Sequence, residues 1–173
     1  MFCSSKFVLV CSLLLGIAAG VQAQQPASSS QTTMLGERGV GPPYGMPITL
    51  AQAERAIAAA RLEAAKLKAG DIAIAIADTH GELVAFIRMD TTAIHSILYA
   101  QLKARAAARV RRFTATPPPE IAAAVSTTPD FVGTPGGVPI VIEGRTIGAV
   151  GVSGGEDADL AIAEAAARAV AAG

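Results

Sequence analysis

Asp71-Ile-Ala-Ile-Ala-Ile-Ala-Asp78 begins a stretch that continues through Thr79-His80-Gly81 to Glu82-Leu-Val-Ala-Phe-Ile-Arg-Met-Asp90. In both outer segments, bulky apolar residues alternate with small or polar ones, which is typical of β-strands. The short segment between them contains glycine, so the whole stretch predicts a β-hairpin. Its tip carries His80, at a place where side chains are presented to the surroundings rather than buried.

A second hairpin is predicted near the end of the chain. Gly136-Gly-Val-Pro-Ile-Val-Ile142 is followed by the turn Glu143-Gly144-Arg145 and by Thr146-Ile-Gly-Ala-Val-Gly-Val-Ser-Gly-Gly155. Helices are predicted outside the hairpins, at about 49–67, 92–112, 120–125 and 157–172. The first of these helices has a capping box, formed by Thr49 and Gln52, and Gly70 as its predicted stop.

The predicted elements follow the order α-β-β-α-(α)-β-β-α. Hairpins join antiparallel strands, whereas a parallel nucleotide-binding sheet would need single strands that alternate with helices. The sequence therefore predicts an α/β fold of the α+β type, in which helices pack on a single antiparallel sheet.

The helix predicted at 92–112 carries two stripes and an excess of positive charge. Apolar residues at helical spacing predict a buried face, formed by Ile94, Leu98, Leu102 and Ala106. A neighbouring stripe with a spacing of four holds His95, Tyr99 and Lys103. The helix has no acid and five bases, which are Lys103, Arg105, Arg109, Arg111 and Arg112. This pattern fits either a solvated basic face or one that meets anionic ligands or an acidic surface.

The start of the chain has the pattern of a secretory signal peptide over residues 1–23. Lys6 precedes an apolar run, and Val21-Gln22-Ala23 resembles a cleavage site. The run is too short to span a membrane comfortably, so we expect no stable membrane anchor after cleavage. Residues 24–45 predict a flexible leader, and residues 46–173 predict one folded domain. We therefore expect a periplasmic or secreted protein.

Composition excludes several classes of function. Both cysteines, Cys3 and Cys11, lie in the predicted signal peptide, so the mature domain would use neither disulfides nor thiolate chemistry. The formal net charge is +0 and only 4% of the residues are aromatic. Neither a basic footprint nor an aromatic stacking platform for nucleic acid is therefore expected.

His80 and His95 are the candidates for metal or haem ligation and for acid–base chemistry. The simpler interpretations are a polar turn residue at His80 and a packed or surface residue at His95. The chain has no His-Glu-x-x-His motif, so a zinc hydrolase has little support. Lys103 is suited either to pairing with a carboxylate or to exposure to solvent. Arg88 is suited to binding a carboxylate through two hydrogen bonds.

Four ordered blocks of sequence resemble the GlcG/HbpS haem-binding family, which is related to the C-terminal domain of PduO-type corrinoid adenosyltransferases. The blocks are Ala77–Asp90, Lys103-Ala104, Gly136-Gly-Val-Pro-Ile140 and Ile147–Gly155. The resemblance extends over about 49–170. It implies a small α/β domain that assembles into homo-oligomers and binds haem or a related tetrapyrrole, with haem favoured over a corrinoid.

The resemblance also implies a set of binding residues. His80 and Lys103 match positions of the family, and Thr128 falls in its variable loop. In this interpretation His80 or His95 supplies an axial nitrogen, with His80 as the predicted metal ligand, while Arg88 and Lys103 meet the propionates. No catalytic residue is predicted.

The implied function is that of an exported haem or tetrapyrrole binder for storage, sensing or sequestration. Two alternatives stay open from the sequence. One is an enzyme that acts on a small carboxylated metabolite, and the other is an oligomeric interaction module without a ligand.

Overall fold

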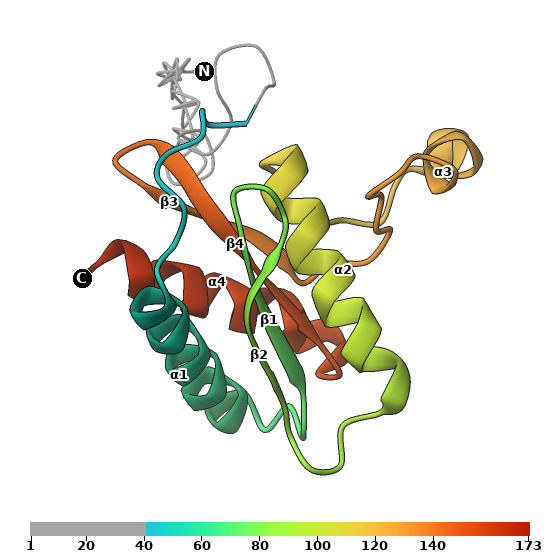
Figure 1. Ribbon diagram of the computed structural model, residues 1–173. Coiled ribbons are helices and arrows are strands. Elements are labelled where there is room, and N and C mark those ends of the chain that lie inside the picture. Colours follow the sequence, from blue (N-terminus) through green and yellow to red (C-terminus); the bar gives the residue numbers. More distant parts are fainter. Residues whose placement is uncertain (1–40) are drawn as a thin grey trace, which may run out of the picture.

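Four strands form one antiparallel sheet in the computed structural model, which describes residues 41–173. In chain order the elements are α1 (Leu50–Leu67), β1 (Ala73–Asp78), β2 (Leu83–Arg88), α2 (Ile94–Val110), α3 (Pro119–Ser126), β3 (Gly137–Ile142), β4 (Arg145–Ser153), the 3-10 turn η2 (Glu156–Ala158) and α4 (Asp159–Ala171). The strand order is β2-β1-β4-β3, and each pair of neighbours is antiparallel (Figure 1). The predicted fold class is confirmed. The predicted signal peptide lies outside the described residues.

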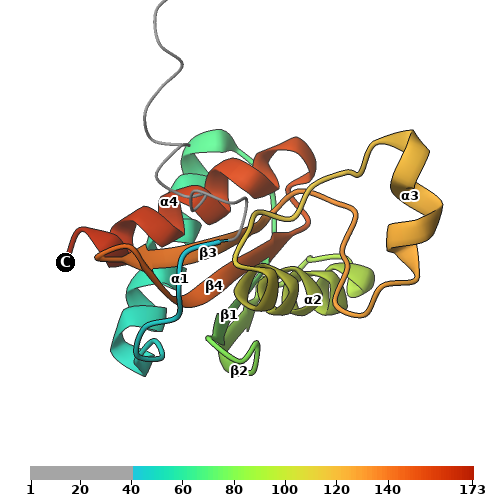
Figure 2. The same cartoon turned by 90° about the horizontal axis from the view of Figure 1, so that it is seen from above.

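The sheet lies between two layers of helices, with α2 on one face and α1 and α4 on the other (Figure 2). The alternating sequence of β1 explains this arrangement, because successive side chains of a strand point to opposite faces. Ile74 and Ile76 join the larger core cluster, which includes residues of α1 and α4. Ala73 and Ala75 join a second cluster, composed largely of alanines, under α2. Both faces of β1 are therefore buried.

Helix α2 approaches the sheet closely because the residues between them are small. A Cβ atom at Gly151 of β4 would collide with the carbonyl oxygen of Ala100 and the amide nitrogen of Ala104. Ala100 and Ala104 are themselves fully buried. Much of the alanine and glycine in this chain therefore serves packing inside one molecule.

The predicted capping box at the start of α1 is confirmed. Thr49 Oγ1 accepts a hydrogen bond from the backbone N–H of Gln52, and Gln52 Oε1 accepts one from the backbone N–H of Thr49. The end of the helix differs slightly from the prediction. Lys68 is the C-cap, with a left-handed φ of 54° and an N–H that bonds to the carbonyls of the last turn, and Gly70, also left-handed, follows two residues later.

The buried face of α2 differs from the predicted one. Ile94, Leu98 and Leu102 are 84%, 58% and 38% exposed, and only Ala106 of the predicted stripe is buried. The face turned inward instead consists of Ser96, Ala100, Lys103, Ala104, Ala106, Ala107 and Ala108. The helix has two apolar faces, and the close approach to β4 selects the face with small side chains.

The first described residues run beside the start of β4. The N–H of Gly45 donates to the carbonyl of Thr146 at 2.8 Å, and the N–H of Thr146 donates to the carbonyl of Pro43 at 2.8 Å. Arg111 at the end of α2 reaches the same segment, with its guanidinium 4.8 Å from the ring centroid of Tyr44. The final residues of the predicted leader are therefore attached to the folded domain.

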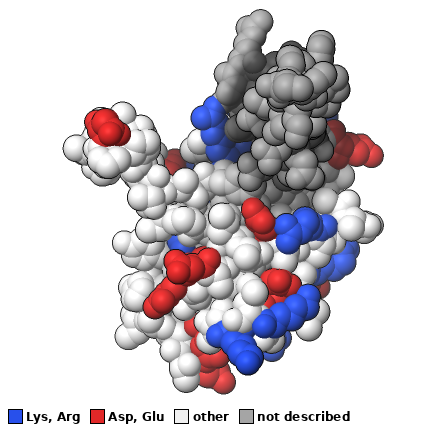
Figure 3. All heavy atoms as spheres, turned by 180° about the vertical axis from the view of Figure 1, so that it is seen from behind, with Lys and Arg blue, Asp and Glu red and all other residues white. Residues whose placement is uncertain are grey.

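Helix α3 projects from the body as an arm, which also stands out at the upper left of Figure 3. The predicted short helix is confirmed here, but none of its residues is buried. The face seen in Figure 3 carries basic and acidic side chains intermixed rather than a patch of one sign. Among residues 41–173, no helix combines the length and the apolar character that crossing a membrane requires.

Candidate functional site

A cavity of about 690 Å³ opens between the first turns of α2, the loop before β3 and the link from β4 to α4. From α2 it is lined by Ala93, His95, Ser96, Tyr99 and Lys103. From the facing segments it is lined by Thr134, Pro135, Ser153, Gly154, Glu156 and Asp159. Its volume lies within the roughly 300–1,000 Å³ that is typical of small-molecule sites.

His95 presents an exposed imidazole at the edge of this cavity. It stands one helical turn from Tyr99, and the two rings meet edge to face with centroids 6.1 Å apart and planes at 84°. No hydrogen bond within the described residues occupies the imidazole nitrogens. A neutral imidazole in this state can bind a metal or exchange a proton.

Lys103 lies under the cavity and does not reach into solvent. Its ammonium donates to Asp159 Oδ2 at 2.8 Å and to the carbonyl of Val152 at 2.9 Å. Asp159 Oδ1 in turn accepts from the N–H of Gly155 at 2.8 Å. The sequence suggested that Lys103 meets a carboxylate, and the carboxylate that it meets belongs to the chain itself. This pair fixes α2, the end of β4 and the start of α4 to one another.

Ser96 places an unpartnered hydroxyl beneath the wall of the cavity. Its side chain is fully buried, and its hydroxyl has no partner among the described residues. A Cβ atom at Gly154 would lie 3.5 Å from this hydroxyl, so the glycine leaves space beside it. A buried polar group without a partner costs free energy, and because this hydroxyl is itself covered, a molecule in the cavity reaches it only if the cavity wall shifts.

His80 lies at the tip of the β1–β2 hairpin, as predicted, with its side chain 77% exposed. The carbonyl of His80 accepts a hydrogen bond from Arg109 Nε at 2.7 Å, close to the last turn of α2. His95 belongs to the first turn of the same helix, and fourteen residues of helix span about 20 Å. The two histidines therefore stand near opposite ends of α2 and do not face one site within a single chain.

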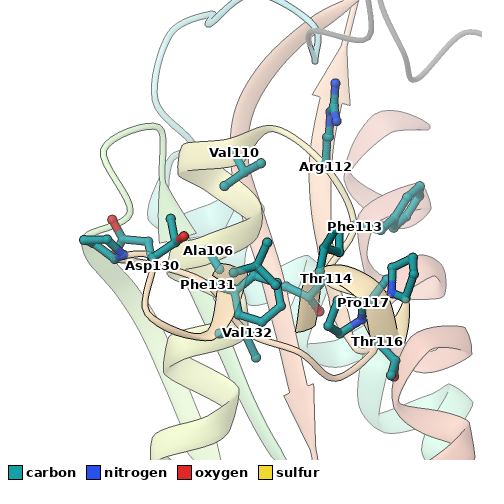
Figure 4. A pocket seen from close by; sticks show the side chains of 16 residues that line it. Ala106, Val110, Arg112, Phe113, Thr114, Thr116, Pro117, Asp130, Phe131 and Val132 are labelled. Carbon is teal, nitrogen blue, oxygen red and sulfur yellow. The ribbon is translucent and has the colours of Figure 1, made fainter. Parts of the chain in front are cut away.

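Arg88 and Thr128 occupy two further surfaces. Arg88 lines a hollow of about 330 Å³ at the end of β2, together with Asp71 and Asp90. Thr128 lines an apolar groove of about 390 Å³ beside α3 (Figure 4). Of the five residues that the sequence proposed for binding, His95 and Lys103 line a common cavity in the described part of the chain, whereas Arg88 and Thr128 line separate ones. Among the described residues, no cluster of three or more His, Cys, Asp or Glu side chains is arranged for a metal.

The basic residues of α2 find acidic partners elsewhere in the chain. Asp130 accepts from Arg105 Nε at 2.9 Å and from Arg109 Nη1 at 2.7 Å. The hydrogen bond from Arg109 is the main cause that holds the pKa of Asp130 below its usual value, and the same bond raises the pKa of Arg109. The pKa of Asp71 is likewise lowered, because its carboxylate accepts bonds from the backbone and side chain of Thr91.

Several residues of the 690 Å³ cavity could not be identified from the sequence. Ser96 and Glu156 belong to no motif, Ser153 was noted only as part of the block Ile147–Gly155, and the fold brings the three together from separate segments. Asp159 lies at the start of α4, where an acid is common at a helix N-terminus, so its sequence position does not indicate a site. The spacing of His95, Tyr99 and Lys103 was the local signal for this site, because a spacing of four places side chains on one side of a helix.

One antiparallel sheet between two helical layers, with a cavity beside its central strand β4, defines a small α/β domain with a ligand-sized site. The model of the family described as "Haem degrading protein HbpS-like" matches residues 48–168, and the chain belongs to this family. The membership predicted from the four sequence blocks is thereby confirmed.

The similarity to known proteins extends over most of the described chain. Protein GlcG of Escherichia coli (strain K12) is 41% identical over 105 residues, which cover 59% of this chain and 78% of GlcG. The crystal structure of protein ORFY of Klebsiella pneumoniae superposes with a TM-score of 0.65 at 28% identity, covering 74% of this chain and 93% of that one. A crystal structure of a PduOC:heme complex shares the fold, with a TM-score of 0.61 at 24% identity and coverages of 72% and 95%.

Proposed function

We propose that this chain is an exported haem-binding protein whose haem site is the cavity beside His95. The observation that carries the proposal is the exposed imidazole of His95 at the edge of a cavity of about 690 Å³. Membership of the HbpS-like family supports the choice of ligand. A protein of the same fold is known as a haem complex, which adds to this support.

The residues of the cavity fit a haem by size and by the atoms that they offer. The volume is that of a small-molecule site, and an imidazole is an established axial ligand of haem iron. His80 also has an exposed imidazole, but it is not among the residues that line this cavity.

Each residue of the site has a definite task in this proposal. His95 binds the iron through a ring nitrogen, and Tyr99 holds the imidazole by edge-to-face contact. Lys103 and Asp159 hold the floor of the cavity, so Lys103 is not available for a propionate. Haem supplies an iron centre that changes oxidation state and that takes an axial ligand from the protein.

Export to the periplasm or the outside is part of the same proposal. Its support is the signal-like pattern of residues 1–23. In that compartment a haem binder would serve storage, sensing or sequestration. Self-association is also proposed, and it is supported by the exposed apolar side chains of α2 and β2, which include Leu83, Leu98 and Leu102.

A haemin titration of the purified protein tests the proposal, followed by visible absorbance. We expect a saturating Soret shift at one haem per chain, which His95→Ala abolishes or displaces in wavelength. His80→Ala is the matched control, because it removes the other imidazole and leaves the cavity unchanged. If His80→Ala alone abolished the Soret shift, the iron ligand would lie at the hairpin tip instead. If the Soret shift of the wild type did not saturate, haem binding would be refuted.

A further inference from the structure

The charged side chains that line the 690 Å³ cavity leave no free cation for an anionic group. The ammonium of Lys103 is occupied by Asp159 and by the carbonyl of Val152, and its side chain is 3% exposed. Among residues 41–173 no arginine lines the cavity, and the remaining charged lining residue is Glu156. Lys103 and Asp159 cancel, so with a neutral His95 the lining carries the negative charge of Glu156.

Glu156 is held at the cavity by the backbone of the link between β4 and α4. Its φ of 53° lies in the left-handed region, which residues other than glycine adopt only uncommonly. The link is fixed by two hydrogen bonds: Gly155 N–H donates to Asp159 Oδ1 at 2.8 Å, and Ala158 N–H donates to the carbonyl of Gly155 at 3.0 Å. Glu156 is exposed, and its carboxylate has no partner within the described residues. The fold therefore places an unneutralised anion at this cavity.

Haem has two unlike edges. Its propionates place negative charge on one edge, whereas methyl and vinyl groups make the opposite edge apolar. A propionate inside the cavity would lose hydration without gaining a cation, and burying a charge without a partner is costly. The uncharged part of the lining, which includes Ala93, Tyr99 and Pro135, is suited to the apolar edge instead.

We propose that haem enters this cavity with its apolar edge first and keeps its propionates in solvent, and that Glu156 excludes the reverse orientation. This inference rests on the proposed haem site at His95. The apolar edge packs against Ala93, Tyr99 and Pro135, while the carboxylate of Glu156 repels a propionate that approaches the cavity. A group attached to a propionate should then leave binding intact, because the attachment point stays outside the protein.

Agarose beads that carry haemin, coupled through a propionate and a flexible spacer, test this orientation. We expect the beads to retain the wild type, soluble haemin to release it, and beads without haemin to retain nothing. His95→Ala should reduce the retention, which ties it to the cavity. A Soret titration with free haemin accompanies the assay, because free haemin reports binding in either orientation.

Glu156→Lys should relax the selection, since it replaces the repelling carboxylate by a cation that can pair with a propionate. The variant gains binding with the propionates inward, which free haemin can use and tethered haemin cannot. We expect the ratio of bead affinity to free-haemin affinity to fall by about fivefold, as for one exposed ion pair. Asp157→Lys is the matched control, because Asp157 is exposed, undergoes the same change of charge and does not line the cavity. Its ratio should equal that of the wild type.

Three outcomes would contradict the proposal. If free haemin gave a saturating Soret shift that depends on His95 but the beads did not retain the wild type, the propionates would lie inside, and the proposed haem site would stand. If Glu156→Lys left the ratio unchanged, or changed it no more than Asp157→Lys, Glu156 would not select the orientation. If the Soret shift of the wild type did not saturate, haem binding itself would fail, and the orientation with it.

Discussion

The ammonium of Lys103 lies 2.8 Å from Asp159 Oδ2, and the two side chains are only 3% and 7% exposed. This ion pair joins the middle of α2 to the first residue of α4. The same ammonium bonds to the carbonyl of Val152 in β4, so three elements meet at one charged group. Because both side chains are almost fully buried, the pair is part of the core, and both residues line the floor of the 690 Å³ cavity.

Removing Lys103 should destabilise the fold strongly. Lys103→Met leaves the carboxylate of Asp159 buried without its partner, and breaking such a pair costs about 3–5 kcal/mol. Urea unfolding followed by circular dichroism measures the free energy of unfolding. The double variant Lys103→Met/Asp159→Leu should recover a large part of the loss, since it removes both buried charges. A double variant no more stable than Lys103→Met would contradict this explanation.

Adding one methyl group at Gly151 should also be costly. Gly151→Ala places a Cβ against the backbone of Ala100 and Ala104, so α2 must move away from β4. Overpacking typically lowers the free energy of unfolding by about 1–3 kcal/mol. Because the new Cβ meets backbone atoms, which cannot move aside as a side chain can, we expect a loss at or above the upper end of this range. Gly70→Ala is the control, because its Cβ meets nothing and only its φ of 71° opposes the change. Thermal unfolding should therefore show a clearly larger decrease in melting temperature for Gly151→Ala.

The strands and turns could be predicted because their signals are local. The alternation in Ala73–Asp78 and the capping box at Thr49 each depend on a few neighbouring residues. The inward face of α2 could not be predicted in this way. Ala100 and Leu98 are both apolar and lie on different faces of the helix, so the sequence of α2 permits either face to be buried. The glycine at 151, in a distant strand, decides in favour of the alanine face.

The candidate site was predictable only where it is built from one helix. His95 and Lys103 share a stripe, and the structure brings both to the same cavity. Ser96 was missed because a serine without a hydrogen-bond partner among residues 41–173 has no signature in sequence. Glu156 was missed because its position depends on the turn between β4 and α4. Arg88 and Thr128 were proposed together with His95, yet the fold places them on separate surfaces.

The hydrogen bonds that Asp130 accepts from Arg105 and Arg109 of α2 predict a pH dependence of stability. The pKa of Asp130 is lowered in the folded state, mainly by the hydrogen bond from Arg109 and further by Arg105. A lowered folded pKa means that the stabilisation is present above the unfolded pKa, near 3.9, and is lost as the pH falls through the folded pKa. The melting temperature of wild type should therefore exceed that of Asp130→Asn at neutral pH.

This difference in melting temperature should shrink as the pH falls below about 4, when Asp130 becomes protonated. Asp71 also has a lowered pKa, but it is present in both proteins, so its effect cancels in the comparison. Scanning calorimetry at a series of pH values gives the two curves. A difference that stays constant down to the lowest pH would show that Asp130 stabilises the protein by something other than its charge.

The exposed leucines of α2 and β2 predict self-association through this face. Leu83, Leu98 and Leu102 line one hollow of about 210 Å³ between the two elements. Leu98→Gln should weaken association by about tenfold, because it removes one leucine side chain from the buried interface. Leu62→Gln is the matched control, since Leu62 is 66% exposed on α1, on the opposite face of the sheet. Sedimentation velocity over a range of concentrations measures the self-association of both variants and of the wild type. An equal effect of the two substitutions would place the interface elsewhere, and a wild type that stays monomeric at high concentration would refute self-association.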